Sequence, residues 1–86
     1  MLRDFTALDL ETTGLNPKTD KIIEIGAIRI RDGKEADRWE SLVNPGCQIS
    51  NFTEGLTGIR NEDLMSAPVI EEVLPALMDF LMDDVL

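Results

Sequence analysis

Residues 7–15, Ala-Leu-Asp-Leu-Glu-Thr-Thr-Gly-Leu, form a short apolar run that carries two carboxylates, Asp9 and Glu11, and ends in a glycine turn. Side chains of a strand point alternately to its two faces, so Asp9 and Glu11 are expected on the same face. Two neighbouring anions repel each other and lose hydration, which a cation between them would relieve. Hard divalent cations take carboxylate oxygens, and paired metals on acidic sites hydrolyse phosphodiesters. The alternative is a strand with one solvated edge.

The sequence on either side of this run predicts a three-stranded antiparallel meander. Apolar and β-branched residues indicate strands at about residues 4–11, 22–30 and 35–43, and the third is the least apolar. Between the second and third strands lies Asp32-Gly33, a strong signal for a two-residue hairpin turn. The loop over residues 12–20 holds turn residues of its own.

The second half of the chain predicts helical structure. Residues 47–65 are expected to be irregular with short helical turns, the clearest at residues 61–65. Apolar residues at helical spacing predict a longer helix over residues 69–82. Ser66 is expected to cap this helix and Pro68 to lie in its first turn, whereas Pro75 predicts a kink or a restart.

Composition limits the chain to one small globular domain. It has 86 residues, a formal net charge of −9, no His, no Tyr and a single cysteine, so no internal disulfide can form. No signal-peptide pattern and no apolar run long enough to span a bilayer is present, which makes the cytoplasm the expected location and a membrane partner unexpected. The acidic balance is compatible with a nucleic-acid partner but gives it no support.

An ordered series of motifs resembles the DEDD-type 3′–5′ exonucleases, the superfamily that includes the proofreading exonuclease of DNA polymerase III. The first motif covers residues 9–15 (DLETTGL) and continues at residues 22–27 (IIEIGA). Residues 42–46 (LVNPG), 56–59 (LTGI) and 67–68 (AP) follow in the family's order. The resemblance implies an α/β chain with the ribonuclease H-like fold, here its N-terminal part: the meander, a helix, and a stop before the next strand.

The same resemblance implies the chemistry of the site. Asp9 and Glu11 would be the catalytic metal ligands of a two-metal centre that holds Mg²⁺ or Mn²⁺ roughly 4 Å apart. The residues that would bind the terminal nucleotide are Thr12, Thr13, Gly14, Leu15 and Ile59. For each of these five proposed nucleotide-binding residues, a purely structural role in a turn or loop is the alternative.

The resemblance also shows what residues 1–86 lack. Family members use four acidic ligands and a His or Tyr base, and this sequence supplies only the first two ligands. The expectation is therefore the N-terminal part of a single exonuclease domain, inactive alone, which acts on single-stranded 3′ ends, on DNA before RNA. DNA polymerase subunits are expected partners, and an unpaired sheet edge predicts self-association. The alternative is a non-catalytic interaction module on an exonuclease-like scaffold.

Expectations also exist for three further residues, and two of them, Glu24 and Trp39, have an alternative interpretation. Glu24 is either a solvated strand residue, the favoured interpretation, or a carboxylate that supports the metal ligands. Gly26 is expected to permit close packing between strands. Trp39 is expected to pack under a loop, with stacking on a base as the alternative.

Overall fold

The sheet of this protein is an antiparallel meander with the strand order β1-β2-β3. The computed structural model describes residues 3–14, 16 and 18–82. Its strands are β1 (Phe5–Thr12), β2 (Ile22–Arg31) and β3 (Lys34–Leu42). The predicted meander is confirmed, and each strand begins and ends within one residue of its expected position.

A tight turn between β2 and β3 sets the start of their pairing. Asp32 and Gly33 have φ values of 54° and 77°, the left-handed geometry of a two-residue hairpin turn. The carboxylate of Asp4 accepts a hydrogen bond from the Asp32 amide at 2.7 Å, and Arg3 forms an ion pair with Asp32 at 2.6 Å. The predicted hairpin is therefore confirmed, and the start of the chain is tied to its tip.

Two short helices lie in the segment that is predicted to be irregular with short helical turns. Helix α1 (Asn51–Thr57) is capped by the Ser50 hydroxyl, which accepts from the Thr53 amide, and ends at Gly58 with φ 78°. Helix α2 (Asn61–Met65) matches the expected turn. The predicted short helical turns are thus confirmed, and Ser50 and Gly58 supply the start and stop signals that make the first of them a complete helix.

The long helix α3 (Ile70–Met82) is confirmed, with two corrections at its start. The Ser66 hydroxyl donates to the Asp63 carbonyl at the end of α2, so Ser66 does not cap α3. The Pro68 carbonyl accepts from the Asn44 amide at 2.8 Å, which places Pro68 before the helix. The helix continues through Pro75, and the alternative of a restart there is not observed. Among the described residues, no helix has the length and apolarity needed to cross a membrane.

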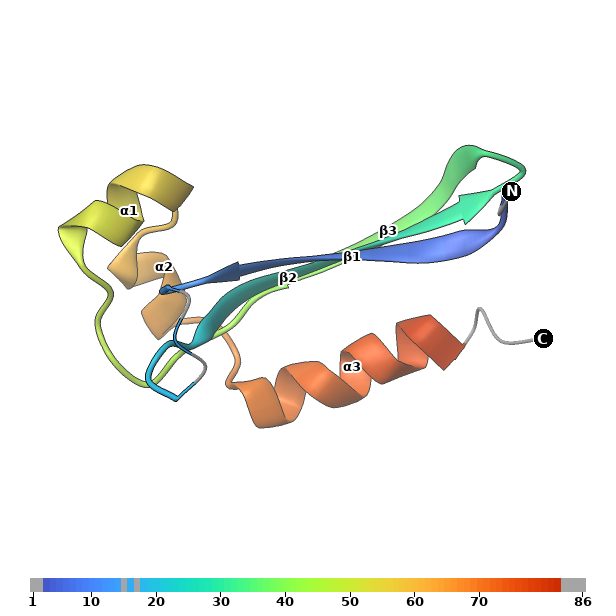
Figure 1. Ribbon diagram of the computed structural model, residues 1–86. Helices are drawn as coiled ribbons and strands as arrows, with labels where there is room; N and C mark the ends of the chain where they lie inside the picture. The colour runs from blue at the N-terminus through green and yellow to red at the C-terminus, as the bar shows by residue number, and fades with distance from the viewer. Residues whose placement is uncertain (1–2, 15, 17, 83–86) are drawn as a thin grey trace.

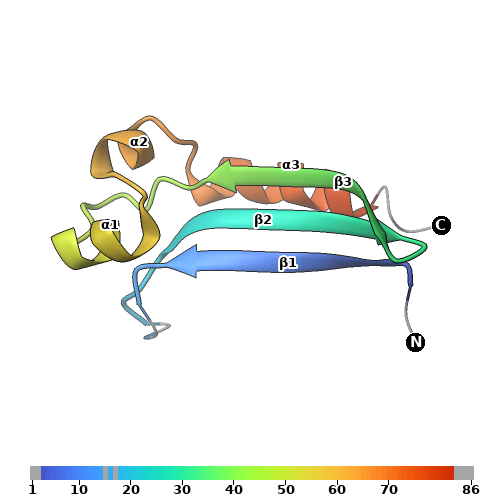
Figure 2. The same cartoon turned by 90° about the horizontal axis from the view of Figure 1, so that it is seen from above.

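Helix α3 covers one face of the sheet, and the opposite face is bare along its middle (Figure 1). Seen from above, α3 runs along β3 and leaves β1 uncovered (Figure 2). Leu8 and Leu10 of β1 consequently remain 53% and 48% exposed. The buried core between sheet and helix consists of Ile25, Ala27, Val43, Val73 and Leu77, with Trp39 packed against it. The packing role expected of Trp39 is confirmed, under a helix rather than a loop.

A β-bulge at the start of β2 helps to form a second core. Glu11 pairs with Glu24 and Thr12 pairs with Ile22, so Ile23 is an extra residue in the ladder. Ile22 packs against the α3 core, whereas Ile23 is fully buried with Ile49, Ile59 and Leu64. The bulge thereby attaches the segment that contains α1 and α2 to the sheet at the end of β1, as Figures 1 and 2 both show.

Truncation of Ile23 is expected to destabilise the chain strongly. Ile23→Ala should lower the free energy of unfolding by about 2–5 kcal/mol and Ile23→Val by about 0.5–1.5 kcal/mol, because each leaves a cavity in the second core. Urea denaturation followed by circular dichroism measures both values. Leu56→Ala, at a position 74% exposed, is the matched control and should change stability by less than about 0.5 kcal/mol. Equal losses for Ile23→Ala and Leu56→Ala would contradict this assignment of the core.

Candidate metal and nucleotide site

Strand β1 presents Asp9 and Glu11 on the face of the sheet that points away from α3. Their neighbour Leu10 pairs with Ile25, and Ile25 belongs to the core under α3. Because side chains alternate along a strand, Asp9 and Glu11 project to the opposite, bare face. Asp9 is exposed and Glu11 is half-buried. The predicted same-face arrangement of the two carboxylates is confirmed.

Two further carboxylates share this face. Glu24 lies directly opposite Glu11, and Glu40 lies opposite Gly26, which itself pairs with Asp9. Partial burial raises the pKa of Glu24, and the negative charges of Glu40, Glu11 and Asp9 raise it further, in that order. Glu24 is thus a half-buried strand residue on the open face of the sheet, and Glu40 is a member of the acidic face that sequence reasoning missed.

Gly26 opens a recess between Asp9 and Glu40. A hollow of about 140 Å³ lies over this position, and Ile28 and Arg38 contribute to its lining. A Cβ atom added at Gly26 would meet only the Asp9 carbonyl oxygen, at 3.9 Å, which is an ordinary contact. The prediction that Gly26 permits close packing between strands is therefore wrong. Its missing side chain instead leaves room on the acidic face.

The loop after Glu11 is held by its own hydrogen bonds. The Thr12 hydroxyl donates to the Gly14 carbonyl at 2.7 Å. The Thr13 hydroxyl donates to Asp20 at 2.9 Å and accepts from the Lys21 amide at 2.9 Å. Thr12, Thr13 and Gly14 thus follow the carboxylate pair in one connected turn, and Leu15 lies outside the described residues.

Ile59 lies in the second core rather than on the open surface. Its side chain is 9% exposed and packs with Ile23, Ile49 and Leu64. Leu56, in the same LTGI motif, is 74% exposed. The motif therefore combines a buried residue that fixes its position with an exposed apolar residue beside it.

The donor set of Asp9 and Glu11 has the chemistry that Mg²⁺ or Mn²⁺ requires, since both are carboxylates on an accessible face. Within residues 3–14, 16 and 18–82, however, no three His, Cys, Asp or Glu side chains converge closely enough to hold a metal. Asp9 and Glu11 therefore fit the first two ligands of a metal centre, but the described residues do not supply a third ligand that would complete the site.

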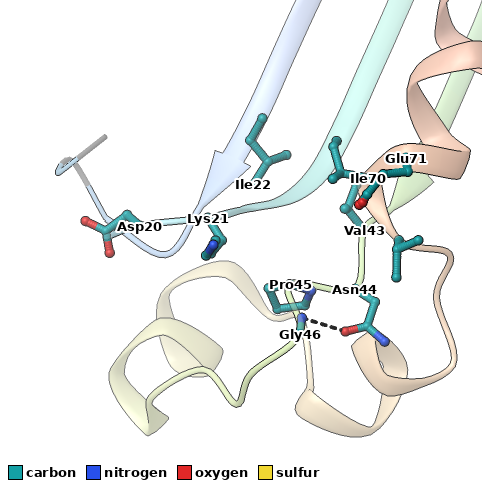
Figure 3. Close-up of a pocket in the computed structure, with 10 residues that line it drawn as sticks. Asp20, Lys21, Ile22, Val43, Asn44, Pro45, Gly46, Ile70 and Glu71 are labelled. Carbon is teal, nitrogen blue, oxygen red and sulfur yellow. Dashed lines mark hydrogen bonds between the residues drawn. The ribbon is translucent and has the colours of Figure 1, made fainter. Parts of the chain in front are cut away.

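A larger cavity, of about 390 Å³, lies away from the carboxylates. It lies where the segment before β2 meets the end of β3 and the start of α3, with Ile22, Val43 and Ile70 among its lining residues (Figure 3). The Asn44 side chain accepts from the Gly46 amide at 2.8 Å on its wall. Its lining includes neither Asp9 nor Glu11, so it is separate from the acidic face.

Comparison with known proteins decides which family these features belong to. A family-wide sequence profile described as exonuclease matches residues 6–86. The chain belongs to the exonuclease family. This exonuclease chain is 45% identical over 82 residues to the PolC-type DNA polymerase III of Thermotoga petrophila. It is 37% identical over 81 residues to the epsilon subunit of DNA polymerase III of Aquifex aeolicus.

Solved structures confirm the ribonuclease H-like exonuclease fold. The nuclease domain of a DEDDh-family 3′-exonuclease bound to rAMP matches 98% of the exonuclease chain with a TM-score of 0.85 and 25% identity. Exonuclease X, in complex with 5′ overhanging duplex DNA, matches 84% of the chain with a TM-score of 0.72 and 30% identity. The predicted family and fold are therefore confirmed.

The exonuclease chain spans only part of each of these proteins. The match to the Thermotoga polymerase covers 95% of this chain but only 6% of the polymerase. The match to the Aquifex subunit covers 94% of this chain and 40% of the subunit. In the two solved structures it covers 46% and 42% of the chain. The matched region contains the first motif with Asp9 and Glu11.

Replacement of Glu24 is expected to stabilise the protein at neutral pH. Its folded-state pKa lies above the ordinary value of 4.5, so the folded chain binds more protons there and stability falls as pH rises through that range. Glu24→Gln should therefore be more stable than the wild type at neutral pH, and the gain should vanish below about pH 4. Urea unfolding across pH measures both effects.

The control for this experiment is Glu35→Gln. The hydrogen bond from Arg38, at 2.7 Å, lowers the pKa of Glu35, so this change should have the opposite sign at neutral pH. A Glu24→Gln variant less stable than the wild type at neutral pH would show that repulsion on the acidic face does not govern Glu24.

Proposed function

We propose that this chain supplies the first half of a two-metal 3′–5′ exonuclease site, with Asp9 and Glu11 as metal ligands. The observation that carries the proposal is their position side by side on the bare face of β1, in a chain that belongs to the exonuclease family. The environment of Glu24 is consistent with it: partial burial raises the pKa of this carboxyl first, and the neighbouring charges of Glu40, Glu11 and Asp9, which a cation would offset, raise it further. The complete site would hydrolyse phosphodiester bonds at nucleic-acid 3′ ends.

The chain's own residues would perform three tasks in this reaction. Asp9, the more exposed of the two carboxylates, would contact both Mg²⁺ or Mn²⁺ ions, and Glu11 would hold one of them. When bound, the two ions would activate a water and stabilise the leaving 3′ oxygen. The recess over Gly26 would leave space beside Asp9 for an ion or its bound water.

The loop after Glu11 would receive the terminal nucleotide. Thr12, Thr13 and Gly14 follow the carboxylates without interruption, and Leu15 is proposed to contact the last base. The hydroxyl protons of Thr12 and Thr13 are already donated to acceptors within the loop. The nucleotide would therefore be bound by backbone groups of the loop and by hydroxyl oxygens that act as acceptors. Ile59 would contribute to nucleotide binding indirectly, because its burial in the second core would hold the LTGI motif in place.

Residues 1–86 are proposed to be the N-terminal part of a single exonuclease domain. Two ligands hold two ions poorly, and the sequence contains no His or Tyr to serve as the base that the family resemblance implies. Binding of metal without cleavage is therefore the expected behaviour of the 86-residue chain. The non-catalytic interaction module remains the alternative function.

Single-stranded 3′ ends are the proposed substrates, with DNA preferred over RNA. The preference rests on two relatives that are DNA polymerase III proteins, whereas another solved relative is a 3′-exonuclease that recognises the 3′ end of a histone mRNA stem-loop. DNA polymerase subunits are the corresponding proposed partners, and the cytoplasm is the proposed location.

Metal binding through Asp9 is the first test of this function. Calorimetry with Mn²⁺ should show binding to the wild-type chain and at least about tenfold weaker binding to Asp9→Asn, which removes one carboxylate ligand. Glu62→Gln, on the exposed surface of α2, removes one charge elsewhere and should bind as the wild type does. Degradation of 3′-labelled single-stranded DNA, assayed in parallel, should be absent. Equal Mn²⁺ binding by the wild type and Asp9→Asn would refute the assignment.

The free edge of β1 is the basis of a second proposal, self-association of the chain. Within the described residues β1 pairs only with β2, and an unpaired edge is a template for another strand. Leu8 and Leu10 lie exposed along this edge strand and add apolar surface. The proposed occupant of the edge is β1 of a second copy.

Charges at these leucines should suppress the association. Light scattering after size-exclusion chromatography should show a dimer whose fraction rises with concentration, and Leu8→Lys/Leu10→Lys should weaken it by at least about tenfold. The control, Leu56→Lys, places the charge on exposed α1 and should leave the dimer intact. A wild-type chain that stays monomeric at every concentration would exclude this mode of association.

A further inference from the structure

We propose that Asp20 is a positioning residue for the nucleotide-binding loop, an inference that rests on the proposed function. Its side chain lies seven residues beyond Thr13 in the sequence yet contacts the turn that follows Glu11. Oδ1 accepts the hydroxyl proton of Thr13 at 2.9 Å, and Oδ2 accepts from the amide of Asn16 at 2.7 Å. One carboxylate therefore connects two separate points of this turn.

Gly14 fits beneath this carboxylate only because it lacks a side chain. A Cβ atom at Gly14 would lie 2.6 Å from Oδ2 and 2.8 Å from Cγ of Asp20, closer than such contacts occur. The turn and the carboxylate are thus mutually fitted: Asp20 fixes the path of the backbone, and Gly14 permits the approach.

The contacts of Asp20 distinguish it from a further metal ligand. Each of its oxygens already accepts a hydrogen bond from the loop, one from Thr13 and one from Asn16, so the carboxylate is engaged in holding the loop. In Figure 3 the carboxylate points away from Ile22 and the apolar part of the large cavity. Hydrogen bonds to an ionised carboxylate are stronger than neutral ones, which suits a residue that holds a loop in one conformation.

The consequence is that Asp20 acts on nucleotide binding through Thr13 and Gly14. The Thr13 hydroxyl donates to Asp20 and accepts from the Lys21 amide, so it is held from both sides and serves the shape of the pocket. Removal of the carboxylate would release Thr13 and Asn16 together, while Asp9 and Glu11 would keep their positions on β1. Nucleotide affinity should fall, and metal affinity should not.

The experiment measures two dissociation constants for each variant by NMR titration of the full chain. One is for Mg²⁺ alone and the other is for thymidine 5′-monophosphate in saturating Mg²⁺. Asp20→Ala should weaken nucleotide binding about tenfold, the loss of a charge-assisted hydrogen bond, with Mg²⁺ affinity changed by less than about twofold. Asp4→Ala is the matched control, since it removes a carboxylate that also accepts from a backbone amide at 2.7 Å, but at the hairpin. It should change neither constant.

Gly14→Ala tests the fitted contact directly. Alone, it should displace Asp20 and weaken nucleotide binding about tenfold, and in the Gly14→Ala/Asp20→Ala double variant the two losses should not add. Asp20→Asn, which keeps one acceptor oxygen, should give an intermediate loss and replaces Asp20→Ala if that variant does not fold. Three results would overturn the positioning role of Asp20 but leave the proposed function standing. They are an unchanged nucleotide affinity in Asp20→Ala, additive losses in the double variant, and a loss of Mg²⁺ affinity in Asp20→Ala equal to its loss of nucleotide affinity. A wild-type chain that binds no nucleotide would overturn the proposed function as well.

Discussion

The alternation of side chains along the β1–β2 ladder is the constraint on which the rest of the structure depends. Leu10 and Ile25 face α3 as a pair, and this fixes Asp9, Glu11 and Glu24 on the other side. Strand β1 thereby places its apolar Leu8 and Leu10 on the α3 side of the sheet and its two carboxylates on the other side. A shift of one residue in this pairing would turn Asp9 and Glu11 to the α3 side and Leu8 and Leu10 to the bare face, so the same register that forms the sheet also forms the acidic face.

Bulges interrupt the alternation at two points, and both affect the acidic face. The bulge at Ile23 lets Ile22 and Ile23 enter different cores, which brings the LTGI segment to the end of the sheet that carries Glu11. The second bulge lies between Arg29 and Ile30, where β3 holds one extra residue. Because of it Glu40 pairs with Gly26 and joins the acidic face.

The sequence alone was sufficient for the strands, the hairpin and the two carboxylates, because each depends on residues close together in the chain. Glu40 could not be found in this way. Continued from the Asp32-Gly33 turn without a bulge, the β2–β3 pairing would place Trp39 opposite Gly26 and turn Glu40 toward α3. Asp20 was missed because its partners become apparent only once the loop is folded. The bounds of helix α1 were not predicted within residues 47–65, although Ser50 and Gly58 are ordinary boundary residues, since seven residues give little periodicity.

The acidic face also explains how a chain of net charge −9 can belong to a family that works on polyanions. Four carboxylates on one side of a small sheet repel phosphate, and partial burial together with their mutual repulsion raises the pKa of Glu24. In the proposed function a divalent ion reverses this local charge, so the affinity for nucleic acid is linked to the metal. Phosphate is then attracted only where ions are held, beside Asp9 and Glu11. The loop held by Asp20 follows at the next residue, which couples electrostatic attraction to recognition of the chain end.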